Sequence, residues 1–113
     1  MANTYTQLYV HIVFAVKYRW GMIGKEWRKE LYKYISGIIE QKGHKTYAIN
    51  GMSDHIHILV SLSPSESVSD LVRDIKRSSS IWINDNGFLR QSFAWQEGYS
   101  AFSYNQSSLP AVI

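Results

Sequence analysis

The stretch that decides the fold is DHIHILVSL, residues 54–62. Its side chains alternate between two faces with a period of two, which predicts a β-strand over residues 55–62. The aliphatic face must be the one that helices cover, and it carries Ile56, Ile58, Val60 and Leu62. His55 and His57 then lie together on the opposite face, about 6–7 Å apart at ~3.3 Å per residue.

The residues before this strand predict three further elements. Alternation predicts a strand over 5–17, with His11 on the face away from the core. Apolar residues at helical spacing predict a helix over 25–42 that stops at Gly43. A short strand over 45–51 follows, and residues 51–54 are expected to form the turn into the histidine strand.

The residues after the histidine strand predict one helix and one further strand. A helix is expected from a cap at Ser65 or Ser67 to about Asn84, and Asn86-Gly87 has the composition of a loop. The aromatic-rich residues 93–104 predict a last strand with a bend at Gly98.

The order β-α-β-β-α-β predicts an α+β fold of the ferredoxin-like, split βαβ type. One antiparallel sheet carries both helices on one face, and residues 1–113 form a single domain of ordinary size. The first and third strands are neighbours at the centre of this sheet, so His11 is expected near the histidine pair. The fold hosts many functions and does not itself select one.

Composition excludes several classes of protein. The 45% hydrophobic and 19% charged residues are typical of a globular domain and not of a disordered tail. No apolar run approaches the ~20 residues that span a bilayer, and the opening residues MANTYTQ lack the basic n-region that is typical of a secretory leader. The absence of cysteine excludes disulfides and thiolate metal sites, so the expected location is the reducing cytoplasm.

The two histidines on one strand face have two interpretations. Imidazoles at this spacing can converge on one divalent cation. A His-x-His on a strand is more often just two polar residues on a wet face. The central strand of this fold favours a site, whereas His11 is interpreted as a hydrogen-bonding neighbour in preference to a third ligand.

The sequence also resembles a known protein family. DHIHI at 54–58 matches the HUH motif, histidine–bulky hydrophobic–histidine, of the single-tyrosine transposases of small bacterial and archaeal insertion sequences, the IS200-like transposases. Three further segments are similar to that family in the same order: YVHIVF at 9–14, SDLVRDIK at 69–76 and FAWQEGYSAFS at 93–103.

The resemblance implies an enzyme that cuts and rejoins single-stranded DNA with hairpins near the transposon ends. A tyrosine hydroxyl attacks a phosphodiester and forms a 5′-phosphotyrosine, which leaves a 3′-OH for rejoining and stores the bond energy. His55 and His57 would hold Mg²⁺ or Mn²⁺, which acts on the phosphate as a Lewis acid. The family's proteins work as homodimers, with the tyrosine supplied in trans.

The chain departs from the family at its C-terminus. The nucleophile sits on a third helix after the last strand, and residues 107–113 resemble only the cap and first turn of that helix. The catalytic tyrosine is therefore expected beyond Ile113, and the chain as written is expected to be truncated and inactive in cleavage. Tyr99 and Tyr104 lie on the predicted last strand, where aromatic residues more often pack or stack.

Clustered basic residues are the candidates for DNA phosphate contacts. Arg73, Lys76 and Arg77 lie on the second helix, and Lys17 and Arg19 follow the first strand. Exposed, solubilising charge explains each of them as well. Stacking on bases is one interpretation of Trp95 and Tyr99, and packing against a partner subunit is the other.

Three alternatives remain open. A relaxase or rolling-circle replication initiator also uses HUH histidines, but the small size and the matching segments favour the transposase. A non-catalytic single-stranded nucleic-acid-binding domain would show aromatic residues where this sheet places histidines. A structural dimeric domain would show no salt-dependent DNA binding.

Overall fold

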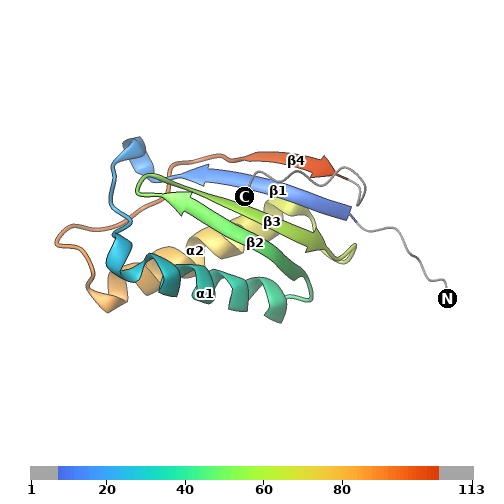
Figure 1. Ribbon diagram of the computed structural model, residues 1–113, viewed down its shortest axis with the longest axis horizontal. Helices are drawn as coiled ribbons and strands as arrows, with labels where there is room; N and C mark the ends of the chain where they lie inside the picture. The colour runs from blue at the N-terminus through green and yellow to red at the C-terminus, as the bar shows by residue number, and fades with distance from the viewer. Residues whose placement is uncertain (1–7, 105–113) are drawn as a thin grey trace.

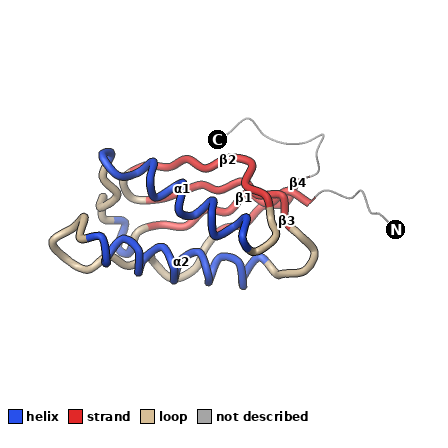
Figure 2. The backbone as a smooth tube through the Cα atoms, turned by 90° about the horizontal axis from the view of Figure 1, so that it is seen from below, coloured by secondary structure: helices blue, strands red, loops and turns tan. Residues whose placement is uncertain are grey.

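The computed structural model describes residues 8–104 and contains a four-stranded sheet and two long helices (Figure 1). The elements follow in the order β1 (Leu8–Ala15), a 3-10 turn (Lys17–Arg19), α1 (Lys25–Gln41), β2 (Lys45–Met52), β3 (His55–Leu62), α2 (Val68–Asn86) and β4 (Ser100–Tyr104). The strand order is β2-β3-β1-β4, and every neighbouring pair is antiparallel. Figure 2 shows both helices on the same side of the sheet. The predicted α+β, ferredoxin-like fold is confirmed.

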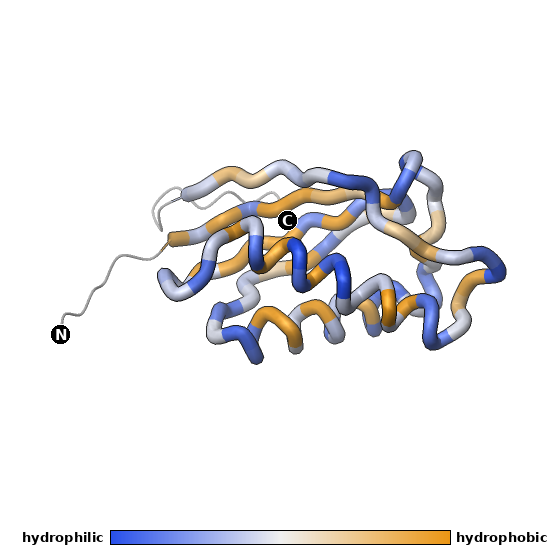
Figure 3. The backbone as a smooth tube through the Cα atoms, turned by 180° about the vertical axis from the view of Figure 1, so that it is seen from behind, coloured by the Kyte–Doolittle hydropathy of each residue, from blue (hydrophilic) through white to orange (hydrophobic). Residues whose placement is uncertain are grey.

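The register of the two central strands follows from their apolar faces. Phe14 lies opposite Ile56 and Ile12 opposite Ile58, and all four side chains are buried under the helices. The same register leaves His57 opposite Val13 on the other face. Apolar and polar segments alternate along both helices (Figure 3). The helical residues buried against the sheet are Trp27, Leu31, Ile35 and Ile39 of α1 and Leu71, Val72, Ile75, Ser79 and Ile83 of α2.

The predicted helix boundaries have local causes in the structure. The Ser67 hydroxyl accepts a hydrogen bond from the Asp70 backbone N–H, which caps α2. Gly43 follows α1 with a φ of 92°, and Gly87 ends α2 with a φ of 66°. Both glycines adopt the left-handed conformation that ends helices. Helix α2 runs to Asn86, two residues past the predicted end, so Asn86 is helical and not part of the loop.

The predicted last strand is wrong over residues 93–99. Only Ser100–Tyr104 form β4, because Gly98 adopts a φ of 87° that interrupts extended pairing. Before that point a single bridge joins Trp95 to Val16. The aromatic side chains here reflect packing: Phe93 is buried, and the Trp95 ring contacts the Phe93 and Phe14 rings edge-on, with centroids 4.8 Å apart in each case.

The structure differs from the predicted turn before β3, and it does not describe the residues of the predicted third helix. Strand β2 extends to Met52, so the turn before β3 is shorter than the predicted 51–54. The expected start of a third helix at 107–113 lies outside the described residues. Among residues 8–104 no helix is long and apolar enough to cross a membrane.

Candidate metal and DNA site

Strand β3 places His55 and His57 together on the open face of the sheet. Their ring centroids lie 4.9 Å apart in an edge-on arrangement. Each ring has its Nδ1 atom in a hydrogen bond: His55 Nδ1 with Asp54 Oδ1 at 2.7 Å, and His57 Nδ1 with His11 Nε2 at 3.1 Å. Within residues 8–104 neither Nε2 atom has a hydrogen-bond partner, so this part of the chain leaves both available to a ligand.

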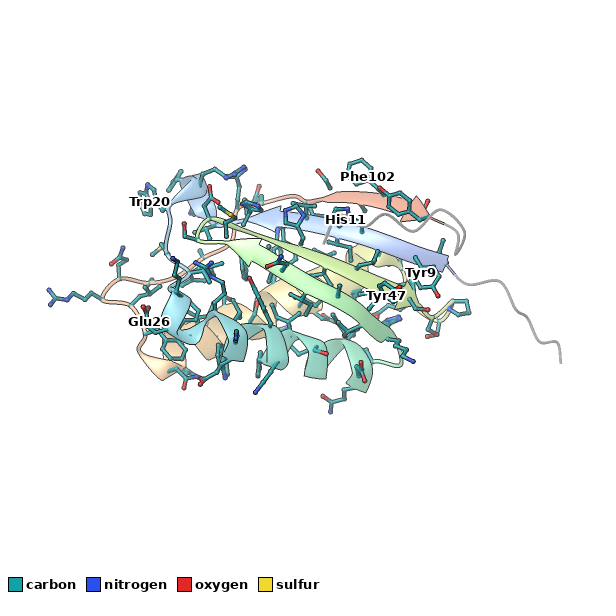
Figure 4. The ribbon with its side chains drawn as sticks, viewed as in Figure 1. Tyr9, His11, Trp20, Glu26, Tyr47 and Phe102 are labelled. Carbon is teal, nitrogen blue, oxygen red and sulfur yellow. The ribbon has the colours of Figure 1, made fainter. Side chains whose placement is uncertain are left out.

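His11 lies beside the pair, as the order of the strands predicts. It sits on β1, is buried, and stacks on His57 with ring centroids 5.2 Å apart (labelled in Figure 4). Its Nε2 is engaged with His57 Nδ1, which fits a hydrogen-bonding neighbour better than a third ligand. Burial lowers the pKa of His11, and burial, followed by the charges of His55 and His11, lowers the pKa of His57. Neutral imidazole, the form that binds metal, is thereby favoured.

A pocket of about 430 Å³ opens beside the pair. It is lined by the C-terminal end of β1, by His55 and His57, by Arg19, and by the segment 96–100. Tyr99 is the tyrosine that lines it among the described residues, and its side chain is exposed. The pocket is open enough to admit a phosphate group next to the two imidazoles.

Asp54 is a site residue that the sequence interpretation did not single out. One carboxylate oxygen, Oδ1, faces His55, and the other, Oδ2, accepts hydrogen bonds from Arg19 Nη2 and Nε at 3.1 and 3.2 Å. The hydrogen bond from His55, then that from Arg19, holds the pKa of Asp54 below its usual value. Its position directly before His55 was the available signal.

Arg19 reaches Asp54 from an unusual backbone. Tyr18 and Arg19 have φ angles of 60° and 59°, in the left-handed region that L-residues rarely adopt. Such strained residues cluster at functional sites. The predicted DNA contact Arg19 thus has an intramolecular partner in the pocket, whereas Lys17 lies exposed with its Nζ 5.4 Å from the Tyr18 ring centroid.

The three basic residues predicted on α2 have different surroundings. Arg73 pairs with Asp70 at 3.1 Å and with Asp74 at 3.3 Å. Lys76 Nζ donates to the backbone carbonyls of Gln96 and Gly98 at 2.7 and 2.8 Å, and burial lowers its pKa. For Arg77, which is exposed, the structure over residues 8–104 shows no ion pair or side-chain hydrogen bond.

These three side chains line a second pocket of about 350 Å³. Gln96 and Glu97 line both pockets, so this short segment separates the basic pocket of α2 from the pocket of the histidine pair. Trp95 lies in the second pocket, but its indole Nε1 donates to Ser79 Oγ at 3.0 Å and its ring packs on Phe14. Packing is therefore the observed role of Trp95.

The described residues offer a divalent cation only part of a protein donor set. Over residues 8–104 no group of three or more histidine, aspartate or glutamate side chains is arranged to hold a metal. Imidazole nitrogen suits transition-metal cations better than Mg²⁺, which prefers oxygen ligands. His55 and His57 line an open pocket, so a cation bound there would take its other ligands as oxygen atoms from water and substrate phosphate. His55 and His57 are the residues that would hold it.

Comparison with known proteins identifies the family to which this chain belongs. The family described as "Transposase IS200 like" matches residues 4–113. The transposase for insertion sequence element IS200 of Salmonella typhimurium is 30% identical over 104 residues, which covers 88% of this chain and 68% of that protein. The ISDra2 transposase TnpA of Deinococcus radiodurans is 32% identical over 73 residues, or 65% of this chain. That alignment spans about half (52%) of the Deinococcus protein.

Two solved structures share the fold. A crystal structure of a protein named as a candidate transposase from Deinococcus radiodurans R1 superposes with a TM-score of 0.83 at 23% identity, covering 94% of this chain and 85% of that one. A REP-associated tyrosine transposase bound to a REP hairpin gives a TM-score of 0.63 at 15% identity, over 92% of this chain and 61% of the other.

Proposed function

Because this chain belongs to the IS200-like transposase family, we propose that it provides the DNA-binding and cation-binding part of an enzyme that cuts and rejoins single-stranded DNA at transposon ends, with a divalent cation held by His55 and His57. The observation that carries the proposal is the pair itself. Both imidazoles have Nδ1 hydrogen-bonded and Nε2 available beside a pocket that can admit a phosphate.

The chain's own residues supply the binding half of the reaction. His55 and His57 would hold the cation through their Nε2 atoms, and the neutral state favoured at His57 would keep a nitrogen lone pair available for it. Mg²⁺ or Mn²⁺, when bound, polarises the scissile phosphate and stabilises the charge that develops on its oxygens. A tyrosine oxygen then bonds to phosphorus as the 3′ oxygen leaves, and the 5′-phosphotyrosine keeps the bond energy for rejoining.

The tyrosine that performs this attack is expected, from the resemblance, outside the described residues 8–104. Tyr99 is the tyrosine of the described part that lines the pocket, so it is the control residue in any test of cleavage. Tyr104 lies opposite Tyr9 on β4 and does not line the pocket.

Phosphate contacts along the second pocket would bring the strand to the histidine pair. Arg77 is our first choice for such a contact, because its guanidinium is exposed and has no partner in residues 8–104. Lys17, which is exposed, is a further candidate, and Arg73 ranks below it because Asp70 and Asp74 already pair with its guanidinium. Arg19 and Lys76 donate to groups of the protein itself, which favours structural roles for both.

The bound partner is proposed to be single-stranded DNA that carries a hairpin. The likeness to a REP-associated transposase bound to a REP hairpin supports this choice, as does the family. The same family suggests a homodimer, and sedimentation of the chain at several concentrations would test that state directly.

The proposal is tested with a single-stranded oligonucleotide that ends in a transposon hairpin and carries a 3′ label, because a 5′-phosphotyrosine retains the 3′-side fragment. Binding is measured by fluorescence anisotropy with and without Mn²⁺, and the covalent adduct is sought on denaturing gels. We expect Mn²⁺ to tighten binding at least tenfold and His57→Ala to remove that gain. Asn50→Ala is the matched control, since Asn50 lies opposite His57 on the neighbouring strand.

Three results would contradict the proposal. Binding that Mn²⁺ and His57→Ala both leave unchanged would remove the cation from the account and favour a non-catalytic nucleic-acid-binding domain. An adduct that Tyr99→Phe abolishes would place the nucleophile within the described residues. If the chain binds no DNA at any salt concentration, the interpretation as a structural domain is favoured.

A further inference from the structure

The neighbour of the histidine pair that the proposed chemistry leaves unused is Asp54. It lies directly before β3, and its Oδ1 is 2.7 Å from His55 Nδ1. An ionised carboxylate only accepts hydrogen bonds, so the proton of this contact belongs to Nδ1. The neutral imidazole of His55 therefore carries its lone pair on Nε2, the atom left to the pocket.

The second histidine is not constrained in the same way. His57 Nδ1 faces His11 Nε2, and either nitrogen of that contact can donate. His57 can thus exchange tautomers by reversing one hydrogen bond with His11, whereas His55 cannot reverse its bond with a carboxylate. The two candidate ligands differ in how firmly their protons are placed.

Asp54 is itself held in place from the other side. Arg19 donates from Nε and from Nη2 to Oδ2, which leaves Oδ1 to His55. The backbone ties the same two segments together, because Val16 N–H donates to the Asp54 carbonyl at 2.9 Å. The left-handed φ of 59° at Arg19 is part of the turn that brings this side chain to the carboxylate.

We propose that Asp54 is a positioning residue that fixes His55 as the Nδ1–H tautomer and so presents Nε2 for cation binding, and that Arg19 orients the Asp54 carboxylate for this task. The consequence for the cation rests on the proposed function. The tautomer itself does not, since it is a property of the cation-free protein. Outer-shell carboxylates of this kind commonly alter metal affinity 10–100-fold when they are removed.

The tautomer is read from two-bond ¹H–¹⁵N correlations of the imidazole rings in cation-free protein at pH 8. We expect His55 to be Nδ1–H in the unmodified chain and to shift towards Nε2–H in Asp54→Ala. Asp54→Asn should retain much of the Nδ1–H form, because an amide oxygen also accepts a hydrogen bond. Asp70→Ala is the matched control, since Asp70 also pairs with an arginine at 3.1 Å but lies away from the pocket.

A second readout is the Mn²⁺ dissociation constant from the EPR signal of free Mn²⁺. It is expected to rise at least tenfold in Asp54→Ala, by a smaller factor in Arg19→Gln, and not in Asp70→Ala. His55 found as Nε2–H in the unmodified chain, or a tautomer that Asp54→Ala leaves unchanged, would overturn the positioning role. Absence of Mn²⁺ binding together with the expected tautomer shift would instead overturn the proposed function and leave the positioning of His55 intact.

Discussion

Replacing Lys76 with methionine tests whether this lysine stabilises the structure or contacts DNA. The sequence predicts that Lys76 contacts DNA, whereas its ammonium donates to the carbonyls of Gln96 and Gly98. Methionine keeps the length of the side chain and removes both hydrogen bonds. The segment 96–100 lines the pocket of the histidine pair, so the change acts on the shape of that pocket and not on a phosphate contact.

The expected cost follows from those two bonds. A hydrogen bond to a charged group contributes about 1.5–3 kcal/mol when well shielded from water. Lys76 is only half-buried, so the pair together should contribute about 1–2 kcal/mol. Urea unfolding should show this loss at an unchanged m-value, and the Gln96 amide, which donates to the Ala15 carbonyl at 2.8 Å, should exchange faster.

The dependence of DNA binding on salt provides the decisive comparison. Each phosphate contact on single-stranded DNA contributes about 0.7 to the slope of log K against log salt concentration. Lys76→Met should leave the slope unchanged, whereas Arg77→Gln should reduce it by ~0.7. A reduced slope in Lys76→Met with unchanged stability would refute the structural role and restore Lys76 as a phosphate contact.

Three further predictions concern stability. Gly51→Ala should destabilise the protein by about 1–3 kcal/mol in urea unfolding, because its Cβ would lie 2.5 Å from the His55 carbonyl oxygen; unchanged stability would mean that β2 can move away from β3. Ile58→Ala should cost about 2–5 kcal/mol in the same assay, since Ile58 is fully buried under the helices, and a loss below 1 kcal/mol would contradict its place in the core. A hydrogen bond from Lys42 lowers the pKa of Asp74, so this pair stabilises the fold above about pH 4 and the contribution is lost as the pH falls through the lowered pKa. Lys42→Met should therefore flatten the acid side of the stability profile, and an unaltered profile would argue against the pair.

The central strand β3 could be predicted because one of its faces is aliphatic and the other carries the two histidines. Ile56 and Ile58 alternate with His55 and His57, so one choice of buried face also placed the histidines on the open side. That reasoning even brought His11 next to the pair, since the strand order follows from the order of the elements. Hydrophobic periodicity therefore predicts both the fold and the position of the histidine pair.

Side-chain partners could not be predicted from the same patterns. Arg19 and Lys76 read as free basic residues, because nothing in the sequence shows that a turn of left-handed residues brings Arg19 to Asp54 or that a segment twenty residues away receives the Lys76 ammonium. The sequence pattern also predicts a strand at the aromatic residues 93 and 95. Their packing under β1 satisfies the same hydrophobic pattern without a continuous ladder.

The most direct test of the account is pulsed EPR of Mn²⁺ bound to this chain in the presence of single-stranded transposon-end DNA. Two histidine nitrogens and one DNA phosphorus should couple to the manganese, and His57→Ala should remove one nitrogen coupling or the bound ion altogether. Manganese that couples to phosphorus alone, with a spectrum that His57→Ala leaves unchanged, would contradict the claim that His55 and His57 hold the cation at the DNA phosphate.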